Sequence, residues 1–184
     1  VEFLTVHCEG LAGGTVAGLV LFAATSRRML LDVAREVVAE SESDLPGARS
    51  DLRALAGRDA SGLSAGEVRS AAVESAAENL ADGLVGPLLA FALIAPVSLP
   101  LAAAGAAWVK GVNTVDSMLG YRGKPVGTVG ARLDDLVMWV PARVAALLIA
   151  LAALSPDALF VGRRWADRPR SPNAGAPMAT LAAV

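Results

Sequence analysis

The feature that most constrains the fold of this 184-residue chain is a set of three long apolar stretches. Residues 10–26 and 83–109 carry no charged side chain, and residues 136–162 are interrupted only by Arg143 and Asp157. Each stretch is near or above the length that can enter a bilayer. Hydrophobic residues make up 54% of the chain, more than in an ordinary soluble domain. We therefore predict an all-α, polytopic integral membrane protein with broken or re-entrant helices and an extramembrane helical section.

These parts are predicted to form a single membrane helical domain over residues 1–184. The expected order is a spanning helix at 10–26, a polar helical section at 27–82, a broken helix pair at 83–109, a membrane helix or hairpin at 136–162 and the start of a truncated helix at 178–184. Pro96 and Pro100 favour a turn between the paired helices, because proline interrupts a helix interior. Such a hairpin returns both flanking polar clusters to one face of the membrane. The start at Val1 and the apolar end lead us to expect a fragment.

The composition excludes several classes of function. The net charge of −2 and the lack of a basic run with interleaved aromatic residues argue against nucleic acid as a partner. One cysteine and one histidine cannot supply a disulfide framework or a zinc site of the usual spacing. The sequence has no glycine-rich phosphate loop. Any bound phosphate must therefore be held by arginines and by carboxylates that share a metal ion.

A first polar cluster directly precedes the second apolar stretch. Glu74, Glu78 and Asp82 are spaced by four and share a helical stripe, with Asn79 beside them. Like charges on one stripe repel each other, so the arrangement would not favour a purely structural helix. It indicates that a cation binds there.

The helix that carries this stripe is predicted to begin at Ser64, which forms a capping-box signature with Glu67, and to run through Asn79. The carboxylates are therefore expected at its C-terminal end. The helix dipole disfavours negative charge at that end. This placement also suggests a purpose other than stability.

Two further clusters have simple structural alternatives. The second contains Lys110, Asn113, Asp116 and Ser117, which share a helical face. An interfacial cap with a snorkelling lysine would also explain that face. The fourth cluster, with Ser171 and Asn173 before the last apolar helix, could cap that helix or offer backbone N–H groups to an anion.

The third cluster enters the last long apolar stretch. Arg132, Asp134 and Asp135 precede it, and Asp135, Trp139 and Arg143 fall on one helical stripe. A buried acid could therefore lie between two guanidinium groups. An internal ion-pair network is the alternative. Arg143 lies inside apolar sequence, where ionisable residues are usually functional.

Taken in order, the polar clusters resemble the adenosylcobinamide-phosphate synthase family of cobalamin biosynthesis, the CobD/CbiB type of membrane protein. The matching segments are 57–59, 73–75, 77–79, 82–83, 112–114, 116–118, 120–121, 131–135, 141–143 and 171–175. Each segment is short, but the ordered set is specific. The resemblance covers the chain from about residue 48 to its end.

The resemblance implies an enzyme, an ATP-dependent acid–amine ligase that joins adenosylcobyric acid to aminopropanol phosphate or aminopropanol. It implies ATP and Mg²⁺ as cofactors, a corrinoid and an amino-alcohol phosphate as substrates, and a multi-pass protein of the plasma membrane, in contact with the lipid bilayer, with its active site on the cytoplasmic face. A homo-oligomeric state is left open.

The resemblance identifies positions and not duties, and we predict the following roles for particular residues. The expected catalytic residues are Glu74, Glu78, Asp116, Asp134 and Asp135. The expected substrate- and phosphate-binding residues are Arg58, Asn79, Lys110, Asn113, Ser117, Arg132, Arg143, Ser171 and Asn173. The expected Mg²⁺ ligands are Glu74, Glu78 and Asp82.

Two other functions are kept as alternatives. A polytopic transporter with an intramembrane charged site would use its broken helices for ion binding and would show flux without ATP turnover. A structural helix-packing subunit would respond to Glu78→Gln and Arg132→Lys with changed stability and no change in catalysis.

Overall fold

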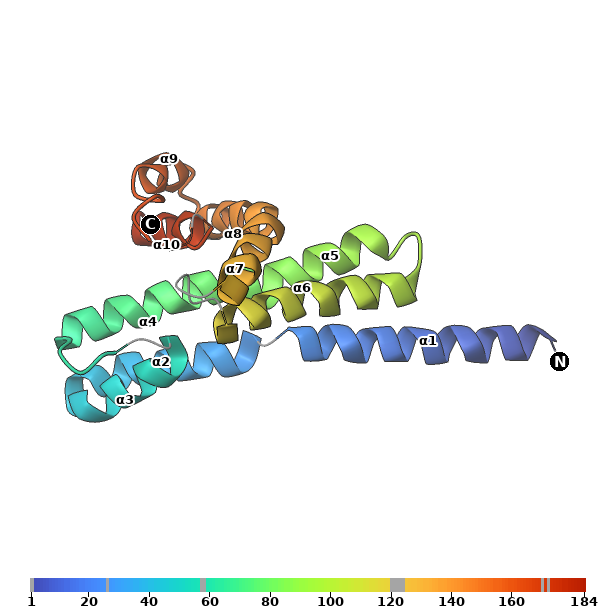
Figure 1. Cartoon of the computed structure of the whole chain (residues 1–184), viewed down its shortest axis with the longest axis horizontal. Helices are drawn as coiled ribbons and strands as arrows, with labels where there is room; N and C mark the ends of the chain where they lie inside the picture. The colour runs from blue at the N-terminus through green and yellow to red at the C-terminus, as the bar shows by residue number, and fades with distance from the viewer. Residues whose placement is uncertain (1, 26, 57–58, 120–124, 170, 172) are drawn as a thin grey trace. The chain divides into compact units, whose positions relative to one another are not determined.

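The computed structural model describes residues 2–25, 27–56, 59–119, 125–169, 171 and 173–184 (Figure 1). These residues form helices and connecting turns without a strand, which confirms the predicted all-α class. The elements are α1 (Glu2–Ala24), α2 (Arg27–Ser43), α3 (Leu45–Ala56), α4 (Ala65–Leu80), the π-helical turn η1 (Ala81–Val85), α5 (Gly86–Ile94), α6 (Leu99–Leu119), α7 (Pro125–Val137), α8 (Trp139–Ala152), α9 (Asp157–Arg163) and α10 (Gly175–Ala182). They divide into two compact units, described below one at a time: residues 1–26 with 82–141, and residues 27–81 with 142–184.

The first unit is built on the hairpin of α5 and α6, which lie side by side in Figure 1. The turn between them lies in the segment where the prolines predict a break. The N–H groups of Val97 and Ser98 both donate to the carbonyl of Ile94, at 2.9 and 3.1 Å. Alanines such as Ala102 and Ala106 line the buried face of α6 and allow close packing. Helices α1 and α7 also pack against α6.

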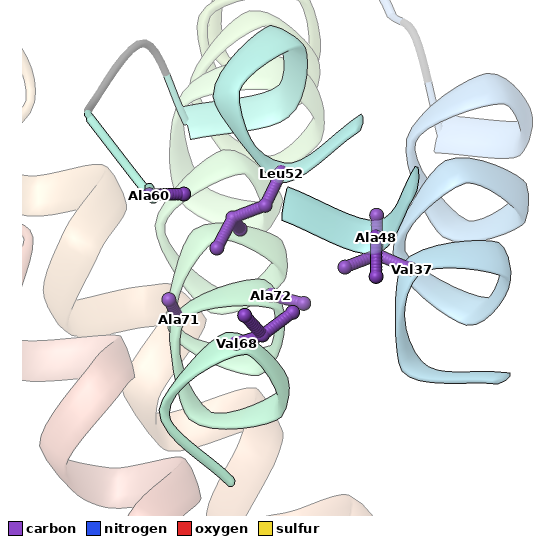
Figure 2. Close-up of a cluster of buried hydrophobic side chains, with 7 residues drawn as sticks. All are labelled: Val37, Ala48, Leu52, Ala60, Val68, Ala71 and Ala72. Atoms are coloured by element: carbon purple, nitrogen blue, oxygen red, sulfur yellow. The ribbon is translucent and has the colours of Figure 1, made fainter. Parts of the chain in front are cut away.

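The second unit has its apolar core where α2, α3 and α4 meet (Figure 2). Seven buried side chains fill it: Val37, Ala48, Leu52, Ala60, Val68, Ala71 and Ala72. The predicted capping box is present, because Ser64 and Glu67 each accept from the other's backbone N–H. Helix α10 packs on α4, and α9 packs on α10.

The helix that carries the carboxylate stripe runs through Asn79 as predicted, because α4 ends at Leu80, but the helical backbone continues beyond that residue. The backbone stays helical over the 30 residues Ala65–Ile94, with η1 between α4 and α5. Pro87 near the start of α5 has no N–H, and its ring would clash with the carbonyl four residues earlier in a regular α-helix. A π-helical turn at this point accommodates the proline. The carboxylates therefore lie within the helix, and the helix-dipole argument does not apply to them.

The apolar helices give limited support for membrane insertion. Among the described residues, Ala65–Ile94 is long and apolar enough to cross a membrane. Gly127–Val137 and Trp139–Ala152, bent by 49°, would add one more if they formed a broken span. The predicted spanning helix at 10–26 has a shorter apolar part, Gly10–Ala24. The number of crossings stays a prediction.

Candidate functional site

In the first unit, a hydrogen bond joins the first and second polar clusters. Asn113 on α6 donates from Nδ2 to Oδ2 of Asp82 in η1, at 3.1 Å. Both side chains are half-buried. Ser117, one turn after Asn113, donates its hydroxyl to the Asn113 carbonyl at 2.9 Å. Carboxylate and amide oxygens are hard donors of the kind that Mg²⁺ accepts.

The other predicted site residues of this unit differ in exposure. Lys110 and Asp116 on α6 are half-buried, whereas Arg132 on α7 is exposed. Asp134 is the buried acid of α7, with 8% of its surface exposed, and Asp135 is only half-buried. The expectation that Asp135 is the buried acid is therefore wrong.

The stripe predicted through Asp135, Trp139 and Arg143 is also interrupted. Helices α7 and α8 are bent by 49° at the break between Val137 and Trp139. Pro141 lies in the first turn of α8 and has no N–H to continue the hydrogen bonding of α7. The three residues therefore do not follow one straight helix, and an acid between two guanidinium groups stays a prediction.

An apolar groove of about 300 Å³ lies between α6 and α7. It is lined by Trp108, Gly111, Val112, Val115, Gly130 and Leu133. Four of these residues, Trp108, Gly111, Val112 and Val115, belong to α6. Their helical spacing places them on a different side of α6 from Lys110, Asn113 and Ser117, so the groove does not coincide with the polar face. The groove suits an apolar group, and a phosphate has no polar partner in it.

In the second unit, Arg143 contacts the fourth cluster. Its guanidinium donates through Nη1 to Oδ1 of Asn173, which is 3% exposed. Ser171 Oγ accepts from the backbone N–H groups of Asn173 and Ala174, at 3.2 and 3.5 Å. A guanidinium has five N–H donors and can hold an amide and an anion at once.

The predicted cap of the last helix is corrected. The N-cap residue of α10 is Ala174, and no side chain caps the helix. Ser171 instead stabilises the turn that precedes α10, because its hydroxyl oxygen accepts hydrogen bonds from the N–H groups two and three residues further along the chain. The turn thus positions Asn173 for its hydrogen bond with Arg143.

Helix α4 carries Glu74, Glu78 and Asn79 of the first cluster in the same unit. Ser70 Oγ donates to Glu74 Oε1 at 3.2 Å, and Asn79 Nδ2 donates to the Ser75 carbonyl at 3.0 Å. Glu78 is half-buried. Because α10 packs on α4, the second unit brings together the helix of the first cluster and the helix that follows the fourth.

Sequence reasoning did not single out Ser75, which contacts the predicted site residue Asn79. Its side chain is 3% exposed, and its hydroxyl lies 3.4 Å from Asn79 Nδ2. The spacing of four between Ser75 and Asn79 was the available signal. Arg58, a predicted binding residue, lies outside the described residues.

A metal site made by the protein alone is not found in the part of the chain that the structure describes. No group of three or more His, Cys, Asp or Glu side chains there could hold a metal ion. Glu74, Glu78 and Asp82 do not form such a group by themselves. Mg²⁺ commonly needs only one or two protein carboxylates when substrate phosphates complete its shell. The donors present fit that arrangement, and the role of the three carboxylates stays a prediction.

Fold and site together define an all-helical protein with apolar helices, whose carboxylate, amide and guanidinium groups meet in pairs drawn from distant parts of the chain. The chain belongs to the CobD/Cbib protein family, because the model of that family matches residues 2–184. This confirms the family resemblance that the sequence motifs indicate.

Curated relatives agree with the family assignment. A protein of Rhodobacter capsulatus named "Cobalamin biosynthesis protein CobD" is 40% identical over 181 residues, covering 94% of this chain and 54% of the relative. One of the same name from Geobacter metallireducens is 41% identical over 183 residues, covering 94% and 55%. A "Probable cobalamin biosynthesis protein CobD" from Methanothermobacter thermautotrophicus is 34% identical over 193 residues, covering 98% and 61%. The chain thus spans a little more than half the length of these relatives, and no solved structure matches it.

Proposed function

We propose that this chain acts in cobalamin biosynthesis, as part of an adenosylcobinamide-phosphate synthase. The reaction is an ATP-dependent amide ligation of adenosylcobyric acid to aminopropanol phosphate or aminopropanol. Family membership and the names of the relatives support the pathway. The observation that carries the chemistry is the pairing of motif residues far apart in sequence, Asp82 with Asn113 and Arg143 with Asn173.

The proposed chemistry suits a chain with one cysteine and one histidine. A propionate oxygen of the corrinoid attacks the γ-phosphorus of ATP, which forms an acyl phosphate and releases ADP. The amine then attacks the acyl carbon, phosphate leaves, and the amine proton passes to a base. No covalent bond to the protein is needed, so catalysis rests on positioning and on stabilising negative charge.

The residues have distinct proposed roles in this scheme. Arg143 and Arg132 bind phosphate or carboxylate oxygens, since guanidinium groups match their geometry. Asn113 holds Asp82, and Asn173 orients a substrate group next to Arg143. Mg²⁺, when bound, neutralises charge on the phosphates. An acid among Glu74, Glu78, Asp116, Asp134 and Asp135 accepts the amine proton.

We also propose a multi-pass location in the plasma membrane with the polar clusters on the cytoplasmic side. ATP and a corrinoid made in the cytosol have access to the site only from that side. One or two apolar helices and the many exposed apolar side chains support membrane residence. A cysteine placed at Asn173 that reacted with a membrane-impermeant reagent from the periplasm would contradict this orientation.

The deciding experiment is a ligation assay. The full-length protein in detergent would be supplied with ATP, Mg²⁺, adenosylcobyric acid and aminopropanol phosphate, and the amide would be sought by mass spectrometry. The full-length Rhodobacter capsulatus relative would be run in parallel. Amide formation that depends on ATP supports the proposal, and its absence in several lipids while the relative is active would exclude it.

A transporter remains the second candidate because Asp134 is buried on α7, one half of the bent pair that could form a broken span. It predicts movement of an ion or corrinoid across proteoliposomes without ATP hydrolysis. It also predicts that Asp134→Asn abolishes that flux.

A further inference from the structure

Helix α9 packs on α10 through its smallest residues. Ala158 and Gly162 are buried. A Cβ atom added at Gly162 would lie 2.8 Å from the backbone nitrogen of Thr180 and 2.9 Å from the carbonyl carbon of Ala179. The two helices therefore approach backbone to backbone, and the buried residues of α9 are small.

The large apolar side chains of this region point the other way. Leu154 in the preceding turn is 90% exposed, Phe160 is 73% exposed, and Trp165 after the helix is 56% exposed. Val161 is exposed as well. A helix on a water-facing surface normally buries such side chains and exposes polar ones. Here Phe160 and Val161 are exposed together with the polar ends of the helix, which points to an apolar environment on the outer side of α9.

Basic groups border this apolar surface. Arg163 and Arg164 end α9, and the Arg168 guanidinium carbon lies 5.2 Å from the centre of the Trp165 ring. The acidic residues of the same stretch, Asp157 and Asp167, are fewer than its arginines. Tryptophan and arginine side by side next to apolar side chains are typical of a membrane–water interface.

We propose that the surface formed by Leu154, Phe160, Val161, Arg163, Arg164 and Trp165 lies at the edge of the bilayer and binds the headgroups of anionic phospholipids. The positive charge of the arginines matches these lipids, since guanidinium groups bind phosphate in two-point contacts. Arginine-rich segments next to membrane helices are enriched on the cytoplasmic side, so the surface would also orient the protein. The inference rests on the proposed membrane residence and is independent of the amide ligation.

The test uses the fluorescence of Trp165. Trp108 and Trp139 are replaced by phenylalanine, which leaves one tryptophan in the chain. The protein is reconstituted in vesicles of roughly three parts phosphatidylcholine to one part phosphatidylglycerol. Either lipid in turn carries bromine, which quenches tryptophan on contact. We expect brominated phosphatidylglycerol to quench Trp165 about threefold more per mole than brominated phosphatidylcholine.

Two double variants identify the groups responsible. Arg163→Gln with Arg164→Gln should abolish the preference for phosphatidylglycerol, while quenching by both lipids persists. Arg35→Gln with Arg53→Gln removes the same charge from exposed arginines of α2 and α3 and should leave the preference intact. If the two lipids quench Trp165 equally in the protein that keeps Arg163 and Arg164, the proposal is overturned. It is also overturned if neither lipid quenches Trp165. The ligation assay is scored separately, so its failure would not be confused with either result.

Discussion

Asn113 and Asp82 are separated by 31 positions in sequence and are joined by a hydrogen bond of 3.1 Å from Nδ2 to Oδ2. The bond ties the π-helical turn η1 to α6, two elements of the first unit. Both residues belong to family motifs that sequence reasoning assigned to the site. An asparagine that donates to a carboxylate fixes the direction of that carboxylate.

Replacing Asn113 by aspartate should impair the proposed ligation. The change removes the donor and places a second carboxylate against Asp82. Hydrogen bonds to charged groups contribute about 1.5–3 kcal/mol, so the rate of amide formation should fall by roughly tenfold to a hundredfold. The initial rate of product formation measures this effect.

Thr114→Val is the matched control for Asn113→Asp. Thr114 is the next residue of α6, is exposed, and donates to the carbonyl of Lys110 in its own helix. Loss of the Thr114 hydroxyl should change the rate of amide formation by less than about twofold. An Asn113→Asp protein with the rate of the unchanged chain would remove the pair from the site.

Arg143→Lys should weaken substrate binding. Lysine keeps the positive charge but lacks the planar fork that can serve Asn173 and an anion together. The KM for ATP or for the corrinoid should rise about tenfold, with a smaller change in kcat. Arg53→Lys, at an exposed arginine of α3, is the control. If both KM values stay within about twofold of the original, Arg143 does not contact an anionic substrate.

Local sequence patterns predicted part of this architecture. The capping box at Ser64 and Glu67 and the break between α5 and α6 follow from short-range rules about hydroxyl caps and proline. The π-helical turn did not follow, because a single proline can end a helix, kink it or widen one turn. Only packing along the whole of Ala65–Ile94 decides between these outcomes.

The sequence predicted which residues belong to the candidate site, but it did not predict which of them contact each other. Helical spacing relates Asp135 to Arg143 only while the helix is straight, and the 49° bend between α7 and α8 breaks that relation. The contacts of Arg143 with Asn173 and of Asp82 with Asn113 span about thirty residues each. Such contacts depend on tertiary packing, which local periodicity does not encode.

The acidic surface of α2 offers a prediction about pH. Burial, and then repulsion from Asp51 and Glu36, raise the pKa of Glu40 above its usual value. Oε2 of Glu40 is buried without a hydrogen-bond partner. A carboxyl group whose pKa is raised on folding destabilises the fold when it is ionised, above its folded pKa, and the penalty disappears as the pH falls below the unfolded pKa. Glu40→Gln should therefore raise Tm at pH 7, with the gain shrinking towards pH 4.

Glu42→Gln is the control for this substitution. Glu42 is an exposed acid of the same helix and lies 3.6 Å from the guanidinium of Arg69. Its neutralisation should give no gain in Tm at any pH. Thermal unfolding of the three proteins across the pH range compares them directly, and a Glu40→Gln protein with an unchanged Tm at pH 7 would refute the account of Glu40.

The junction of α9 and α10 should tolerate no side chain at Gly175. A Cβ there would lie 1.8 Å from the carbonyl oxygen of Ala166, and that atom is backbone and cannot rotate away. Gly175→Ala should reduce the free energy of unfolding by at least about 2 kcal/mol.

Gly66→Ala is the matched control, because nothing lies within 4 Å of its added Cβ. Alanine at that helical position should instead stabilise the protein by about 0.4–1 kcal/mol. Denaturant unfolding of the two variants measures both effects. Equal stability of the two variants would show that the close approach of Gly175 to Ala166 is not a feature of the folded protein.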